Sequence, residues 1–168
     1  MYKKQTQSGF TMVETLIYIS IIGGVISTFI SFSLSITGTR NKTFVMQEVL
    51  ANSRTALQYI NQKILAASEV AGPIEGNSAT SLELEMDGIG DNLVFSVTDG
   101  VLYVTEGTSD PIALTSSAIN ITDLQFTNLS EADIKDNIRI NMTTAYRYNS
   151  TKEFDYSLTL RTGTSLRR

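Results

Sequence analysis

The sequence contains no cysteine and no histidine, and only two of its 168 residues are proline. The chain therefore cannot form a disulfide, a thiol nucleophile or a histidine base, and it lacks the usual ligands of a zinc site. Its fold must be held together by packing alone. We expect no cofactor and no metal, and we expect that the protein is not an enzyme.

Basic residues are fewer than acidic ones, 13 against 17, and the formal net charge is −4. No basic patch stands out along the chain, which argues against nucleic acid as the main ligand. The length is sufficient for one modest domain with its own core.

A long uncharged run extends from Thr15 to Thr39 and is dominated by isoleucine, phenylalanine, valine and leucine. It exceeds the ~20 residues that a helix needs to cross a bilayer, so we predict a membrane-spanning helix. Two alternatives remain open. The run is either a buried core helix, or a cleaved secretory signal with Ser35–Gly38 as its small-residue site.

The basic residues around this run indicate its orientation. Lys3 and Lys4 precede it closely, and short basic flanks stay on the cytoplasmic side. Arg40 and Lys42 follow the run and weaken the asymmetry. We predict a single-pass protein of the cytoplasmic membrane, with its N-terminus inside and the residues beyond about 40 outside.

One carboxylate, Glu14, interrupts the apolar residues at the start of this region. Either it lies close enough to the interface to stay hydrated, or it pairs with a cation, because charges within membrane helices are costly. Cleavage just before Phe10 would create such a cation, a new amine about 6 Å along a helix axis from Glu14. A neighbouring subunit, shifted by that distance, would bring its own amine to this carboxylate.

The residues from Lys3 to Ile17 resemble the prepilin signature of type IV pilins and type II secretion pseudopilins. The resemblance rests on a short basic leader that ends in Gly9, on Phe10 directly after it, and on Glu14 at the fifth position of the mature chain. A long apolar helix follows, as in that family. The signature covers about the first fifth of the chain.

The resemblance implies that a prepilin peptidase cuts between Gly9 and Phe10 and that Phe10 is then N-methylated. It implies that Glu14 assists assembly by pairing with the N-terminus of a neighbour. The implied partners are the peptidase, other pilin or pseudopilin subunits, an inner-membrane assembly platform and membrane lipid. The protein would end as part of an extracytoplasmic filament.

Two features of the span refine this resemblance. Gly23 and Gly24 fall where many family members carry a glycine that weakens the helix. Many major pilins also carry a proline further along, but this chain has Ser31 there and no proline before Pro73. The departure favours a minor pilin or pseudopilin.

Helical periodicity continues beyond Arg40 as a stripe of residues at three- and four-residue steps, which we expect to pack on a sheet. We expect Gly72 and Pro73 to end the helix. The stripe consists of Met46, Leu50, Ser53, Leu57, Ile60, Ile64 and Ala67.

After this helix the pattern alternates with a period of two, and Asp99-Gly100 is a strong hairpin signal. The predicted strands are Leu82–Met86, Leu93–Val97, Val101–Thr105, Ile119–Phe126, Ile138–Tyr148 and Phe154–Arg161. The segments Ile121–Phe126 and Phe154–Arg161 also loosely resemble the β-rich heads of minor pseudopilins.

A helix followed by strands predicts an α+β fold in which a long N-terminal helix packs on an antiparallel sheet. We expect a leader at 1–9, a membrane and filament-core helix at 10–39, an amphipathic helix at 40–71 and a β-rich globular head at 72–168.

Three weaker patterns have ordinary readings. Asp87–Asn92 offers oxygen atoms to calcium but lacks EF-hand spacing, so a hairpin loop is favoured. Glu131, Asp133 and Asp136 are expected to form a solvated acidic loop. The tail is basic through Arg161, Arg167 and Arg168, and two readings of it stay open: contact with an acidic neighbour, or disorder.

Two other functions compete with that of a filament subunit. A single-span binding or receptor module would keep an intact N-terminus and would tolerate replacement of Gly9. A membrane-tethered hydrolase has no set of residues to support it.

Overall fold

The computed structural model describes residues 9–86, 92–130, 137–148 and 154–166. One long helix, α1 (Met12–Ala66), is followed in these residues by strands that form two antiparallel sheets. This confirms the α+β class and the contact of the long helix with antiparallel strands. The chain divides into two compact units, residues 1–40 and residues 41–168.

In the first unit, nearly every described side chain is exposed, including the large apolar ones of the uncharged run. By length and composition, this part of α1 is suited to be a membrane span or a signal sequence. Among the described residues of this unit, 9–40, no side chain covers the exposed apolar surface, so that surface requires a lipid or protein environment.

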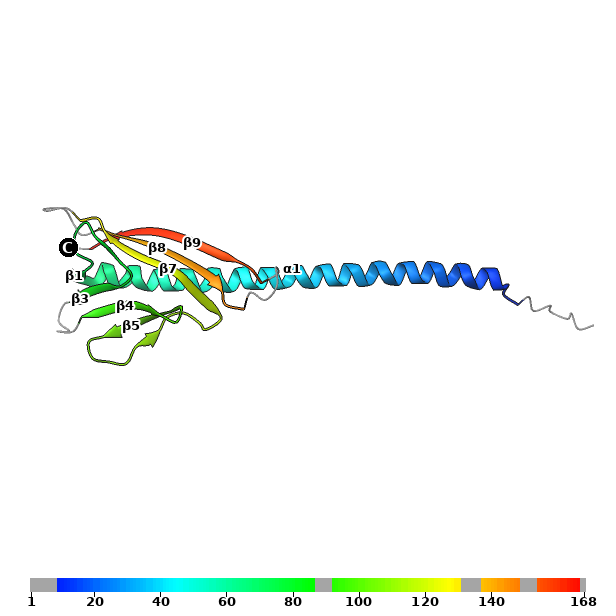
Figure 1. Ribbon diagram of the computed structural model, residues 1–168, viewed down its shortest axis with the longest axis horizontal. Helices are drawn as coiled ribbons and strands as arrows, with labels where there is room; N and C mark the ends of the chain where they lie inside the picture. Colours follow the sequence, from blue (N-terminus) through cyan, green and yellow to red (C-terminus); the bar gives the residue numbers. More distant parts are fainter. Residues whose placement is uncertain (1–8, 87–91, 131–136, 149–153, 167–168) are drawn as a thin grey trace, which may run out of the picture. The chain divides into compact units, whose positions relative to one another are not determined.

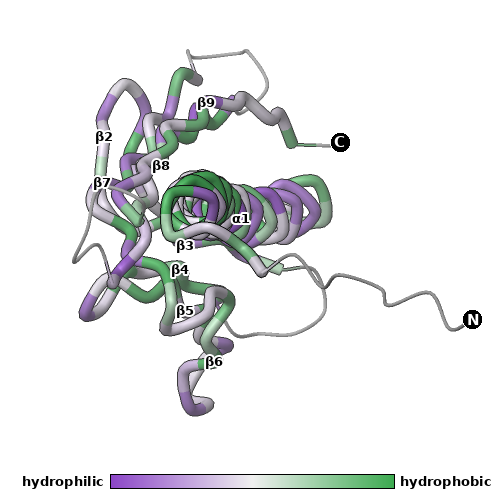
Figure 2. Tube along the Cα trace, turned by 90° about the vertical axis from the view of Figure 1, so that its right-hand side faces the viewer, coloured by the Kyte–Doolittle hydropathy of each residue, from purple (hydrophilic) through white to green (hydrophobic). Residues whose placement is uncertain are grey.

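In the second unit, α1 buries one face of residues 41–66 against both sheets (Figure 2). The predicted stripe holds from Ser53 to Ile64 but is wrong at its start. Val45 and Val49 are fully buried, whereas Met46 is 46% exposed. Because adjacent helical residues point about 100° apart, a shift of one position is enough to exchange the core-facing side chain for an exposed one.

Helix α1 also ends earlier than Gly72 and Pro73, so the predicted helix at 40–71 is too long. Its last residue is Ala66, and the next six residues form strand β1 (Ala67–Gly72). Strand β1 pairs with a later strand, and the hydroxyl of Ser68 donates to the Glu85 carbonyl at 3.0 Å. This pairing outweighs the local preference of the sequence for helix.

The first sheet has the strand order β1-β3-β4-β5-β6 and the second has the order β2-β7-β8-β9 (Figure 1; β2 and β6 are labelled in Figure 2). Every pairing is antiparallel. The remaining bounds are β2 (Ser78–Ala79), β3 (Leu82–Met86), β4 (Leu93–Thr98), β5 (Val101–Glu106), β6 (Ile112–Ala113), β7 (Ile119–Asn128), β8 (Asn137–Tyr146) and β9 (Ser157–Ser165).

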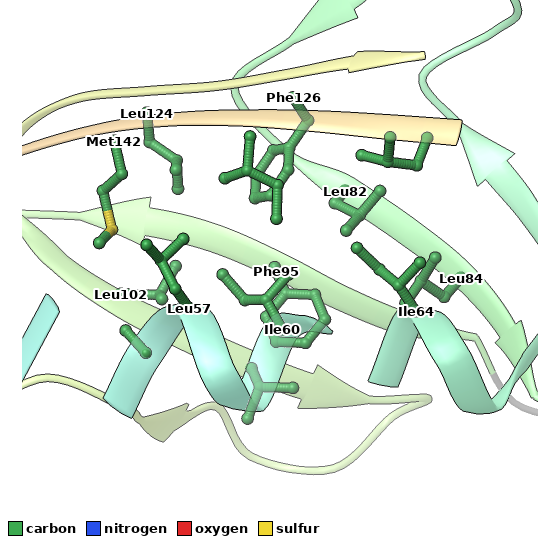
Figure 3. Packing of buried hydrophobic residues seen from close by; sticks show 14 of the residues in the cluster. Leu57, Ile60, Ile64, Leu82, Leu84, Phe95, Leu102, Leu124, Phe126 and Met142 are labelled. Carbon is green, nitrogen blue, oxygen red and sulfur yellow. The ribbon is translucent and has the colours of Figure 1, made fainter. Parts of the chain in front are cut away.

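The core of the second unit lies where the helix meets both sheets (Figure 3). Ile60 and Ile64 of α1 point toward Phe95 of β4 and toward the leucines of β3, and all of them are fully buried. The second sheet contributes Leu124, Phe126 and Met142 from β7 and β8, together with Ile138 and Ile140. Alternate residues of these strands point inward, as the period of two predicts.

The β4–β5 hairpin forms as predicted. Asp99 and Gly100 have φ values of 52° and 73°, the left-handed conformation that a tight two-residue turn requires. A methyl group on Gly100 would overlap the side chain of Asn120. Arg147 holds the turn against the other sheet, because its Nη2 donates to the Asp99 carbonyl at 2.7 Å and its Nε donates to the Ile119 carbonyl at 3.3 Å.

The predicted strand Leu82–Met86 is confirmed with the same bounds as β3, and the other predicted strands are found with changed ends. The predicted strand at Phe154–Arg161 is displaced, since β9 begins at Ser157 and continues to Ser165. The short strands β2 and β6 were not predicted. The proposed leader residues Lys3 and Lys4, most of the segment Asp87–Asn92, the acidic residues Glu131, Asp133 and Asp136, and the tail residues Arg167 and Arg168 lie outside the described residues.

Candidate functional site at the start of helix α1

The start of α1 is fixed by an N-cap that sequence reasoning missed. Thr11 directly precedes the helix, and its Oγ1 accepts a hydrogen bond from the backbone N–H of Glu14 at 3.3 Å. The Thr11 carbonyl accepts the first helical bond, from the N–H of Thr15 at 3.2 Å. The pattern of a threonine followed three residues later by a glutamate is a capping-box signature and was readable in the sequence.

Three side chains spaced four residues apart, those of Phe10, Glu14 and Tyr18, meet at the start of α1. The hydroxyl of Tyr18 donates to Oε1 of Glu14 at 3.2 Å. The ring of Phe10 lies edge-on to the ring of Tyr18, with the ring centres 6.1 Å apart. Tyr18 therefore brings together the two predicted site residues, Phe10 and Glu14, and it was not singled out from the sequence.

Gly9 and Phe10 lie outside the helix, in a segment without regular secondary structure. Gly9 is exposed, and a side chain on it would meet nothing within 4 Å. The Phe10 side chain is 72% exposed. The bond between these two residues is thus open to an approaching protein, and nothing within the described chain requires a glycine at position 9.

Glu14 is half-buried and lies in the first turn of α1, where the positive end of the helix dipole favours a carboxylate. Within the described residues the only ion pair joins Lys63 to Glu106, at 3.5 Å, so Glu14 has no cationic partner in that part of the chain. Its described side-chain partner is the neutral hydroxyl of Tyr18. A carboxylate at this position can still accept a cation from outside.

Several hydroxyl groups of the apolar run are satisfied within the helix. Five of them donate to the carbonyl four residues before them, at 2.9 to 3.0 Å: those of Ser20, Thr28, Ser31, Thr37 and Thr39. Such bonds remove the cost of exposing a hydroxyl to hydrocarbon. The run is therefore compatible with lipid in spite of its many serines and threonines.

A shallow hollow of about 550 Å³ lies on one face of α1 around Gly24. Ser20 and Thr28, one turn away on either side, also have small side chains and line the same hollow. Methyl groups on Gly23 and Gly24 would meet nothing within 4 Å. Packing within the chain therefore does not explain these glycines.

No protein-family model, curated protein or solved structure matches the chain. What the structure does show is a pilin-like architecture, in which a long N-terminal apolar helix packs against antiparallel β-sheets. In the described residues no group of three or more acidic side chains is arranged to hold a metal ion.

Proposed function

We propose that the protein is a filament subunit, a minor pilin or pseudopilin of a type IV pilus or type II secretion system. A prepilin peptidase cuts the chain between Gly9 and Phe10, and Phe10 is N-methylated. The first unit then anchors the subunit in the inner membrane, with the second unit outside, until the assembly platform adds it to a filament.

The observation that carries this proposal is the single carboxylate at the start of a membrane-length helix. Tyr18 contacts both Glu14 and Phe10, and Glu14 lacks a cation in the described chain. Cleavage before Phe10 leaves an ammonium group at the position that can serve such a carboxylate. Pairing the two groups between neighbouring copies offsets the cost of burying each charge, and fixes the stagger of adjacent helices.

The surface of the first unit supports the same proposal. Its apolar side chains are exposed, and the small residues around Gly24 permit a second helix to approach closely. In membranes, helices associate through such small-residue contacts, because lipid is as apolar as the side chains. A bundle of these helices would form the core of the filament.

The intact mass of the protein tests the processing step. Co-expression with an active prepilin peptidase should give a product that lacks nine residues and carries one additional methyl group. An inactive peptidase should leave the full-length mass. The bulky variant Gly9→Val should resist cleavage, whereas Thr11→Ser, which keeps the cap, serves as the matched control and should be cut normally.

The competing functions make different predictions in the same experiment. A single-span binding module keeps Met1 in the presence of active peptidase, and a cleaved secretory signal loses a segment that ends near Ser35–Gly38. Either mass would overturn the proposal.

A further inference from the structure

An open polar groove of about 560 Å³ lies on the second sheet, across β7, β8 and β9. Arg139 of β8 and Arg161 of β9 line it, together with the side chains of Gln125 and Asn137. Gly163, opposite Arg139 in the strand register, has no side chain to fill it. The pairing of β8 with β9 therefore produces the groove, because it places a residue without a side chain opposite Arg139. The guanidinium groups of Arg139 and Arg161 lie along the groove.

The two arginines have no carboxylate partner in the part of the chain that the structure describes. Nε of Arg161 donates to Oδ1 of Asn141 at 3.1 Å, and Nδ2 of Asn141 donates to Asp123 at 3.4 Å. These contacts orient one edge of the Arg161 guanidinium and leave its other N–H groups for a ligand. The side chain of Arg139 is exposed and makes no hydrogen bond within the described residues. The groove thus offers donors suited to carboxylates.

The first sheet carries the opposite charge. Glu69 of β1 and Glu85 of β3 are exposed and lie directly opposite each other in the strand register. Like charges at such positions destabilise a sheet. Neither residue has an ion-pair partner within the described residues. A third carboxylate on β3, Glu83, is already engaged by Asn92 at 2.7 Å.

We propose that the arginine groove of one copy binds the acidic pair Glu69 and Glu85 of a second copy. Glu69 and Glu85 are directly paired across two strands, and Arg139 and Arg161 are diagonal neighbours across two strands. Both pairs therefore have a spacing of about 5 to 8 Å, so each guanidinium can meet one carboxylate. Each copy therefore carries both a basic groove and an acidic pair, so one copy can bind the next through surfaces of opposite charge.

This contact joins two different surfaces, so it is heterologous and repeats from one copy to the next. A heterologous contact that does not close into a ring produces an open chain of subunits. The inference rests on the proposed function, because the filament supplies the neighbouring copy. It adds a contact between the second units to the contact between membrane helices.

Cysteine cross-linking tests the contact cleanly, because the natural chain contains no cysteine. One full-length copy carries Gln125→Cys in the groove, and a second, distinguishable copy carries Ala71→Cys beside the acidic pair. Mild oxidation should join the two copies. The control pair is Gln125→Cys with Ile112→Cys, an exposed residue on β6 at the opposite edge of the first sheet, and it should give little product.

Charge reversal then distinguishes specific binding from chance collision. Reversing Arg139 and Arg161 to glutamate in the first copy should lower the cross-link yield about tenfold. Reversing Glu69 and Glu85 to arginine in the second copy should do the same. Combining both reversals should restore the yield to within about twofold, which also shows that the variants fold.

The intact mass of the same samples separates this inference from the proposed function. The contact is overturned, and the proposed function is kept, if processed protein gives no more cross-link than the control pair. The same conclusion follows if the cross-link yield of processed protein does not change on charge reversal. A charge-dependent cross-link between unprocessed chains supports the contact and overturns the function.

Discussion

At the scale of single residues, Glu14 has two separable roles. Its backbone N–H completes the cap with Thr11, whereas its carboxylate contacts Tyr18. A substitution of the side chain therefore leaves the cap in place. Inside one chain the half-buried carboxylate gains from the helix dipole, an interaction of between about 0.3 and about 2 kcal/mol. Its larger effect is expected only when a neighbour supplies the ammonium group.

The variant Glu14→Ala should be cleaved and methylated normally, because the Gly9–Phe10 bond lies outside the helix. Its incorporation into filaments should fall at least about tenfold, since an ammonium group left unpaired in a buried site costs several kcal/mol. Sheared filaments, compared with the membrane fraction by immunoblot, measure the effect. Tyr18→Phe, which loses one hydrogen bond, should show a smaller defect, and normal incorporation of Glu14→Ala would remove the proposed role of the charge.

The residue-level site could be read from the sequence only in part. Glu14 was conspicuous because a carboxylate in an apolar run is unusual, and Gly9 and Phe10 followed from the resemblance. The cap at Thr11 was readable from the spacing of threonine and glutamate. The role of Tyr18 depends on side-chain geometry, since a tyrosine at a four-residue spacing has several possible orientations.

At the scale of the element, α1 serves two environments in one continuous helix. Its apolar run is exposed on all sides, whereas residues from Val45 to Ile64 bury a single stripe. Residues from Val45 to Ile64 are stabilised by packing against the sheets, whereas the apolar run depends on contacts with lipid or with another protein. Substitutions in the two parts should therefore affect different measurements, stability in one and assembly in the other.

Two adjacent residues of α1 test the packing. Ile64 is fully buried, whereas Leu65 is 48% exposed. Ile64→Ala should lower the free energy of unfolding by about 2–5 kcal/mol, because it opens a cavity among the leucines of β3. Leu65→Ala removes as many atoms and should cost less than about 1 kcal/mol. Urea unfolding of the detergent-solubilised chain, followed by circular dichroism, compares them, and equal losses would contradict the assigned register of the helix.

The hollow around Gly24 allows a test of the apolar half of α1. Gly24→Val should leave the stability of the second unit unchanged, because a side chain there meets nothing within the chain. It should reduce helix association and filament incorporation, because it fills the space that a neighbouring helix needs. Ile22→Val, on the opposite face, is the control. Equal incorporation of both variants, measured in the sheared fraction, would show that this face makes no close contact.

Elements were predictable where local chemistry decides them. The β4–β5 hairpin is specified by Asp99 and Gly100 between two alternating runs, and it was found. The end of α1 was missed because β1 is specified by its pairing with β3, where Ala67 lies opposite Met86. The sequence has no helix stop signal at Ala66. The end of the helix is therefore determined by the pairing of β1 with β3, which is distant in sequence.

At the scale of the whole molecule, the sequence indicated an α+β chain with an apolar first part and a β-rich second part. It did not reveal that the strands form two sheets, or that β2 joins β7 in the second one. Short strands such as β2 and β6 contain two residues each and carry no period. Their pairing, and hence the division of the strands between the two sheets, depends on tertiary packing and not on local sequence.

In the proposed filament, the carboxylate of Glu14 in one copy pairs with the N-terminal amine of another copy. A zero-length carbodiimide reaction, which joins a carboxylate to an amine in direct contact, tests it on assembled protein mixed from isotopically light and heavy copies. We expect cross-linked peptides that join Phe10 of one label to Glu14 of the other. Cross-links confined to peptides of a single label, or none in assembled and processed protein, would contradict it.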